Sequence, residues 1–349
     1  MSQPRRKAGP SKARRAPAPP PPRRGGSGLF KLLILVALLG AAGFAWLCFG
    51  PGPGPREGGT ETTVVLKRGS NLPEISQALA DAGVVRLPFS FALAAKATGG
   101  AGRLRAGEYA IPARASVFQV LSMIRSGKIV HHFVTVPEGF SSAQVADLLN
   151  NNPVLTGHVQ PPAEGSVMPQ TYDVQRGDDR NDALQTMVDA QTKLVDSLWA
   201  GRKPGLPYKS KQQALAMASI VEKETALAAE RPHVAGVYLN RLAKGMRLEA
   251  DPTIIYGLTK GRPLGRTLTH ADVIDTANPF NTYANAGLPP TPIANPGRAS
   301  IEAALNPIAT DDLFFVADGS GGHVFAQTFE QHERNVVRWR QIAQSLKGK

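Results

Sequence analysis

Two glutamates near the end of a predicted helix have the type and spacing that best suit chemistry. They lie in the run Ser-Ile-Val-Glu-Lys-Glu-Thr, in which Glu222 and Glu224 are separated by one lysine. On a helix of about 3.6 residues per turn, Glu224 shares a side with the larger apolar residues, namely Met217, Ile220 and Leu227. Glu222 points about 200° of rotation away from Ile220. The two carboxyl groups are therefore expected in different environments.

An apolar environment raises the pKa of a carboxyl group and keeps its proton available near neutral pH. A general acid needs this property. The pattern therefore favours Glu224 over Glu222 as an acid catalyst. The alternative is an alanine-rich amphipathic helix with two surface glutamates and no catalytic role.

Further polar residues follow in segments rich in glycine and proline, where loops that line a groove are expected. The asparagines could donate and accept hydrogen bonds to a substrate, the tyrosine could stack on a ring, the charged pair could orient a substrate or the acid, and the histidine could reach a cleft. Each has a structural alternative: an Asx turn, a core aromatic, an ion pair or a turn histidine. The predicted substrate-binding residues are Arg247, Asp251, Asn281, Tyr283, Asn295 and His323.

Other kinds of catalytic site find little support. His131 and His132 are neighbours in a predicted strand and point to opposite faces, so they cannot bind one metal together. The sequence has no HExxH motif, no P-loop lysine and no Gly-x-Ser-x-Gly elbow. Cys48 is the only cysteine, so a disulfide framework is excluded within the chain. We predict no metal and no cofactor.

The elements that must position these residues form an α+β pattern. Residues 62–150 read as three strand-then-helix units, which resemble LysM-like modules that bind N-acetyl sugars; a small α/β spacer without a ligand fits the pattern about as well. Residues 151–182 read mostly as loop. Helices are predicted over 183–199 and from 211 to about 229. We therefore expect a small LysM-like domain at 62–150 and a mixed α+β catalytic domain at 151–349.

The N-terminal segment predicts a membrane anchor. Residues 32–50 carry no charge and are long enough, as a helix, to span a hydrocarbon core of about 30 Å. A cleaved signal peptide is the alternative, but its apolar region is usually shorter. Nine basic residues precede the span, which places the N-terminus in the cytoplasm and the rest of the chain outside it. Residues 1–31 read as a disordered basic tail, and residues 51–61 read as a linker.

The net charge of +13 gives no support to a nucleic-acid partner. Nine of the 40 basic residues precede the anchor, in a segment without an acid. The remaining 318 residues hold 31 basic and 27 acidic side chains. The excess charge therefore belongs to the tail, where it suits anionic lipid headgroups at the membrane.

Eight motifs, in order along the chain, resemble the endolytic murein transglycosylase (YceG-like) family. The resemblance covers nearly the whole of the chain beyond the anchor. Gln170, Phe280 and Thr291 depart from the family's usual residues, which leaves the detailed shape of the cleft open. The motifs span Ser219–Thr225, Glu230–Leu242, Gly245–Leu248, Asp251–Tyr256, Asn281–Tyr283, Gly287–Pro290, Pro292–Gly297 and Phe314–His323.

The resemblance implies a single-pass protein of the bacterial inner membrane with a LysM-like domain and a catalytic domain outside the cytoplasm. It implies that Glu224 is the catalytic acid, that no cofactor is needed, and that the substrate is peptidoglycan. Such an enzyme cuts MurNAc-GlcNAc bonds inside nascent glycan strands and so ends their elongation. Peptidoglycan synthases, the penicillin-binding proteins, are the implied partners.

A lytic transglycosylase can work with one carboxyl group. Ordinary glycosidases use two, one as acid and one as nucleophile or base. Here the C6 hydroxyl of the muramic sugar attacks, and a 1,6-anhydro ring forms without water, so Glu224 would act first as acid and then as base. Two alternatives stand: a non-catalytic peptidoglycan-binding scaffold, and a hydrolase that pairs Glu224 with a second carboxylate such as Asp251.

Overall fold

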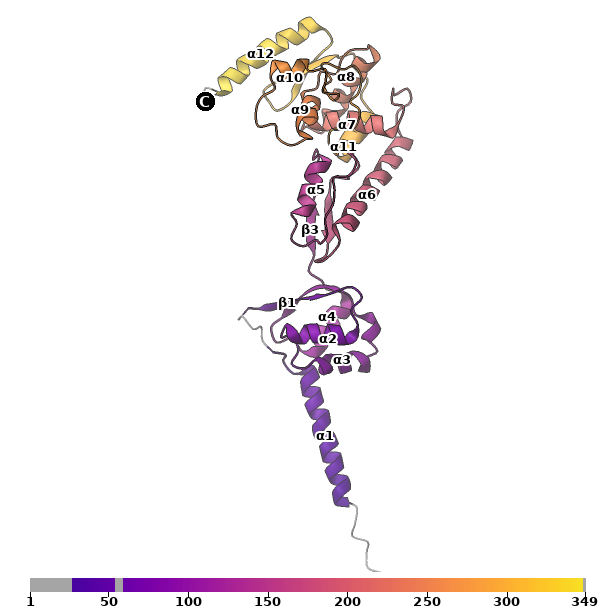
Figure 1. Ribbon diagram of the computed structural model, residues 1–349, viewed down its shortest axis with the longest axis vertical. Coiled ribbons are helices and arrows are strands. Elements are labelled where there is room, and N and C mark those ends of the chain that lie inside the picture. Colours follow the sequence, from indigo (N-terminus) through magenta and orange to yellow (C-terminus); the bar gives the residue numbers. More distant parts are fainter. Residues whose placement is uncertain (1–26, 54–58, 348–349) are drawn as a thin grey trace, which may run out of the picture. The chain divides into compact units, whose positions relative to one another are not determined.

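The computed structural model describes residues 27–53 and 59–347 (Figure 1). Most of the predicted basic tail and part of the predicted linker lie outside these residues. The described chain is a mixed α+β structure whose strands form three two-stranded sheets. Contacts divide it into two compact units that interleave along the sequence. The first holds the chain up to residue 62 with 71–104 and 111–125, and the second holds 63–70, 105–110 and everything from 126 onward.

The predicted anchor is one apolar helix, α1 (Ser27–Phe49), which begins five residues before the predicted start. Its residues from Gly28 to Phe49 are long and apolar enough to cross a membrane. The apolar side chains along α1 are exposed, as lipid contact would require. Only its end packs on the first unit: Cys48 is buried, and the ring of Phe49 stacks on Phe118 with 4.5 Å between centroids.

The first unit contains the helices α2 (Leu72–Asp81), α3 (Pro88–Ala97) and α4 (Val117–Ser126). Asn71 caps α2 by accepting a hydrogen bond from the Glu74 amide at 2.9 Å. Helices α2 and α4, each the helix of a predicted strand-then-helix unit, bury apolar stripes at Ile75, Leu79, Val120, Leu121 and Ile124. Helix α3 was not predicted, because its run Pro-Phe-Ser-Phe-Ala-Leu-Ala-Ala has apolar residues on all sides and no helical period. The strand β1 (Glu61–Leu66) precedes α2, the strand β2 (Gly107–Pro112) lies between α3 and α4, and the two strands pair with each other.

From residue 126 onward, the second unit starts with a two-stranded sheet and a helix. Strands β3 (His132–Thr135) and β4 (Thr171–Val174) pair antiparallel, with Val134 opposite Tyr172. Helix α5 (Ser142–Asn150) is capped by Ser141, whose hydroxyl accepts a hydrogen bond from the Gln144 amide. These elements and α6 (Arg180–Ala200) bury one apolar cluster that includes Val145, Leu149, Val167 and Met187.

A helical body forms the larger core of this unit. It comprises α7 (Lys211–Glu224), α8 (Arg231–Ala243), α9 (Asp251–Thr259), α10 (His270–Ile274) and α11 (Arg298–Leu305). Every residue of α7 from Ala214 to Val221 is buried, because α8, α9 and α11 all pack on it. One of these buried residues is Ser219, whose hydroxyl accepts a hydrogen bond from the Ile293 amide at 2.9 Å. The helix that carries both glutamates is therefore the centre of its domain.

The chain ends with a hairpin and a helix. Strands β5 (Phe314–Ala317) and β6 (His323–Ala326) pair antiparallel, and α12 (Phe329–Lys347) packs on them. Aromatic contacts join the hairpin to α8: Phe315 meets Tyr238 edge-on at 5.7 Å, and Phe325 stacks on His233 at 3.5 Å. The hairpin is thereby placed beside the C-terminal end of α7, which precedes α8.

We expect residues 51–349, expressed without α1, to be soluble and to unfold cooperatively. The reason is that α1 contributes little to the packed interior: Cys48 is buried, and Phe49 stacks on Phe118 but stays 66% exposed. Circular dichroism during heating, in the absence of detergent, measures this. Aggregation without a cooperative transition would contradict the prediction, and the full chain in detergent is the control.

Candidate active site

A pocket of about 410 Å³ lies at the C-terminal end of α7. Four of the predicted site residues line it, namely Glu224, Asp251, Tyr283 and His323. They come from α7, the start of α9, the loop after α10 and the start of β6, so the fold brings together residues that are up to 99 positions apart. The other residues in its wall are Tyr238, Arg241, Leu248, Glu249, Phe315, Val316, Ala317 and His332.

Glu224 is the last residue of α7, where the backbone turns from helical to extended at Thr225. The Thr225 hydroxyl stabilises the extended backbone that follows the helix. It accepts a hydrogen bond from the Leu227 amide and donates one to Glu230, both at 3.1 Å. The helix predicted to continue to about residue 229 therefore ends five residues earlier. This ending places the Glu224 side chain in the pocket wall.

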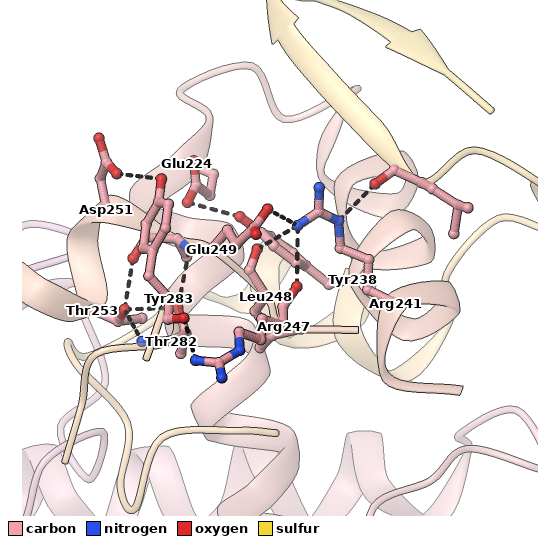
Figure 2. A network of polar contacts seen from close by, with 12 residues as sticks. Glu224, Tyr238, Arg241, Arg247, Leu248, Glu249, Asp251, Thr253, Thr282 and Tyr283 are labelled. Carbon is pink, nitrogen blue, oxygen red and sulfur yellow. Dashed lines mark hydrogen bonds and ion pairs between the residues drawn. The ribbon is translucent and has the colours of Figure 1, made fainter. Parts of the chain in front are cut away.

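The electrostatics of Glu224 are those of a proton donor. Burial raises the pKa of its carboxyl group to about 7, and the negative charge of Asp251 acts in the same direction. The Tyr238 hydroxyl opposes this, because it donates a hydrogen bond to Glu224 Oε1 at 2.8 Å and favours the ionised form (Figure 2). The positive charge of Arg241 also lowers the pKa, as does that of His323 when its ring is protonated. A pKa near 7 lets one group give a proton and take it back at neutral pH.

Asp251 is held by Tyr283 on the other side of the acid. The Tyr283 hydroxyl donates a hydrogen bond to Asp251 Oδ1 at 2.7 Å (Figure 2). Burial and this bond to a carboxylate raise the pKa of Tyr283, so the phenol stays protonated. Arg247 is exposed and donates to the backbone carbonyl of Tyr283 rather than lining the pocket. Of the predicted charged pair, Arg247 and Asp251, only Asp251 lines the pocket that contains Glu224.

Arg241 organises one wall of the pocket and was missed as a site residue. Its Nη1 donates to the carbonyls of Arg247 and Leu248, both at 3.1 Å, and to Glu249 Oε2 at 2.9 Å. Its Nε donates to the carbonyl of Leu313 at 2.6 Å, just before β5. Glu249 has a φ of 56°, a strained conformation for a residue other than glycine. No sequence pattern indicated this network beyond the presence of Arg241 in the motif Glu230–Leu242.

Both predicted asparagines are fully buried and bind backbone instead of lining the pocket. Asn281 Nδ2 donates to the carbonyls of Asp272, Val273 and Asp275 in the last part of α10 and just after it, and its Oδ1 accepts from the Tyr283 amide at 2.9 Å. Asn295 accepts from the Val167 amide and donates to the Phe140 carbonyl, both at 2.9 Å. The Asx-turn alternative describes Asn281. The three departures from the family pattern also lie outside the pocket wall.

Glu222 faces a different environment from Glu224, as helix geometry predicts. Its side chain is only 4% exposed, so the alternative of a surface glutamate is wrong for this residue. It accepts a hydrogen bond from Arg231 Nη2 at 3.1 Å and another from the Gly297 amide at 2.9 Å, next to the start of α11. Glu222 thus joins α7, α8 and α11, while Glu224 faces the pocket.

The comparisons with known proteins agree with this architecture. A sequence model of the YceG-like family matches residues 64–338, and the chain belongs to that family. It is 29% identical over 316 residues to the endolytic murein transglycosylase of Bacillus subtilis, covering 81% of this chain and 86% of the relative. A relative of the same name from Streptococcus pneumoniae is also 29% identical, over 79% of this chain and 58% of its own length. The crystal structure of a YceG-like protein from Listeria monocytogenes matches 79% of this chain and 98% of that one, with a TM-score of 0.50 and 29% identity.

The buried ion pair of Glu222 generates a prediction about stability. Glu222→Gln leaves the Arg231 guanidinium without its nearest carboxylate, so we expect the free energy of unfolding to fall by about 3 kcal/mol. Chemical denaturation measures the change. An unchanged midpoint would show that the pair contributes nothing. Glu302→Gln, which alters an exposed pair with Arg298, is the control and should change the midpoint little.

The environment of Glu224 predicts the direction in which two substitutions shift its pKa. Asp251→Asn removes a negative charge and should lower the pKa of Glu224. Tyr238→Phe removes a hydrogen bond to the ionised form and should raise it. Carboxyl ¹³C NMR across pH 4–9 measures both. Shifts in the same direction, or none, would contradict the assignment of causes.

Proposed function

We propose that this protein is a lytic transglycosylase that cleaves the bond between MurNAc and GlcNAc in peptidoglycan glycan strands. The observation that carries the proposal is Glu224, a carboxyl group with a pKa raised to about 7, in a polar pocket of a YceG-like chain. The names of the relatives, endolytic murein transglycosylases, support the substrate class. We propose cleavage inside nascent strands, which would end their elongation.

In the proposed reaction Glu224 gives its proton to the glycosidic oxygen as the bond from MurNAc C1 breaks. The C6 hydroxyl of the same MurNAc then bonds to C1, and its proton passes to Glu224. The products are a GlcNAc end and a 1,6-anhydro-MurNAc end, and the acid is restored. Asp251 contributes by raising the pKa of Glu224, so that the proton is present when the substrate arrives.

The remaining pocket residues suit an uncharged, hydroxyl-rich substrate. Tyr283 offers a ring and a phenol, and Arg241 and Glu249 add polar atoms beside Leu248 and Phe315. We propose substrate contacts for Tyr283, Asp251 and His323, which line the pocket. For Arg247, Asn281 and Asn295 we propose a supporting role through the Tyr283 loop and the segments around Phe140 and Val167.

We further propose that α1 anchors the chain in the inner membrane, with the N-terminus in the cytoplasm and the rest in the periplasm. The nine basic residues before the helix support this orientation. The proposal keeps the predicted segments: a LysM-like domain at 62–150 and a catalytic domain at 151–349. Peptidoglycan synthases are the proposed partners, because uncrosslinked strands occur where they are made.

One observation favours a second candidate, a hydrolase, since Asp251 lines the same pocket as Glu224 and could activate a water. The product separates the two reactions. A hydrolase leaves an ordinary reducing end, whereas the transglycosylase leaves an anhydro end that is lighter by one water. A non-catalytic scaffold would leave the strands intact.

The test is digestion of purified, uncrosslinked peptidoglycan followed by mass spectrometry. We expect the wild type to produce 1,6-anhydro-MurNAc ends. Glu224→Gln keeps the size of the side chain but has no transferable proton, so the rate should fall by about 10²–10⁴-fold while folding and glycan binding persist. Glu222→Gln, assayed below its melting temperature, should cleave at nearly the wild-type rate. Reducing ends from the wild type, or an active Glu224→Gln protein, would contradict the proposal.

A further inference from the structure

A carboxylate and an imidazole are joined at the edge of the pocket. Glu230, the residue before α8, accepts a hydrogen bond from the His323 backbone amide through Oε1 at 2.8 Å. Its Oε2 lies 2.8 Å from His323 Nδ1 and also accepts the hydroxyl of Thr225, the residue after the proposed acid. Both side chains are mostly buried, with 15% of His323 and 19% of Glu230 exposed. One carboxylate therefore links the end of α7 to the start of β6.

The surroundings fix the imidazole in one orientation. A Cβ atom at position 322 would lie 2.6 Å from Glu230 Oε1, so the glycine there lets the carboxylate approach the β5–β6 turn. The ring of Phe315 meets the His323 ring edge-on, at 5.3 Å and 85°. Two hydrogen bonds and one aromatic wall thus restrain a residue that lines the pocket.

This orientation determines which ring nitrogen is available. The hydrogen bonds from His323 lower the pKa of Glu230, so the carboxylate is ionised and can only accept. Nδ1 must therefore carry a hydrogen, and in the neutral ring Nε2 keeps its lone pair. Among the described residues Nε2 has no hydrogen-bond partner, while the ring it belongs to lines the pocket.

We propose that Glu230 is a positioning residue that holds His323 with an unprotonated Nε2, and that this nitrogen accepts a hydrogen bond from a hydroxyl or acetamide N–H of the N-acetyl sugar. The inference rests on the proposed function. It gives the pocket an acceptor without adding a further negative charge to Asp251 and Glu249, which already line it. A further carboxylate there would hold the Glu224 proton more tightly.

The first experiment measures which nitrogen of the His323 ring carries a proton. The full chain, in detergent micelles and with ¹⁵N-labelled histidine rings, is studied by NMR at a pH where the ring is neutral. We expect the Nε2 resonance of His323 to have the shift of an unprotonated nitrogen and to move when chitotetraose, an N-acetylglucosamine oligomer, is added. Glu230→Gln places an amide N–H₂ opposite Nδ1 and should reverse the tautomer. A wild-type ring protonated on Nε2 overturns the proposal.

The second experiment measures glycan cleavage. With Glu230→Gln we expect kcat/KM to fall about tenfold or more, the order of one lost hydrogen bond. His323→Asn keeps an amide near the Nδ1 position but has none near Nε2, so it should melt near the wild-type temperature and lose activity to the same extent. His323→Gln places its amide oxygen near the Nε2 position and should recover part of the rate.

Asp312→Asn is the matched control. His233 and Asp312 form a similar pair at 2.8 Å, with 25% and 16% of the side chains exposed, and neither residue lines the pocket. This variant should cleave at the wild-type rate. If the wild type makes anhydro ends and Glu230→Gln cleaves as fast, the inference fails and the proposed function stands. If the wild type cleaves nothing, the proposed function fails, and the tautomer and its response to bound chitotetraose still decide the inference.

Discussion

A buried guanidinium group must have acceptors for its N–H groups, because an unpaired charge inside a protein is strongly unfavourable. Arg241 is 7% exposed, and its acceptors lie in two segments that are far apart in the sequence. One is the loop at 247–249, which leads to Asp251, and the other is the carbonyl of Leu313, which leads into β5. Two walls of the pocket thus depend on one side chain of α8. Phe314, stacked over the same guanidinium at 5.0 Å, covers it from the other side.

The sequence predicted those features that depend on local periodicity. The apolar stripes of α2, α4 and α5 are buried as their spacing requires, and α6 covers the helix predicted from residue 183. The different environments of Glu224 and Glu222 also follow from helix geometry, because residues two positions apart on a helix differ by about 200° of rotation about its axis. The motif resemblance indicated the family, to which the chain belongs.

Features that depend on contacts distant in sequence could not be predicted in this way. The Ala-Leu-Ala-Ala run after Thr225 has high helix propensity, yet α7 stops at Glu224 because Thr225 bonds to Glu230, which in turn bonds to His323, 93 residues further along the chain. Asn281 reads equally well as a sugar ligand or as the centre of an Asx turn until its neighbours are known. Burial of Glu222 depends on Arg231 and on Gly297, which lies 75 residues away. No local pattern contains these partners.

The end of α7 has an electrical consequence for the acid. Aligned peptide dipoles give the C-terminal end of a helix a partial negative charge of about half an electron, strongest within the last turn. Glu224 occupies that turn, where an anion is disfavoured by about 0.3–1 kcal/mol and the neutral acid is not. The backbone therefore favours the protonated carboxyl without any side chain. A carboxyl group at this position therefore keeps part of its raised pKa even when the side chains around it change.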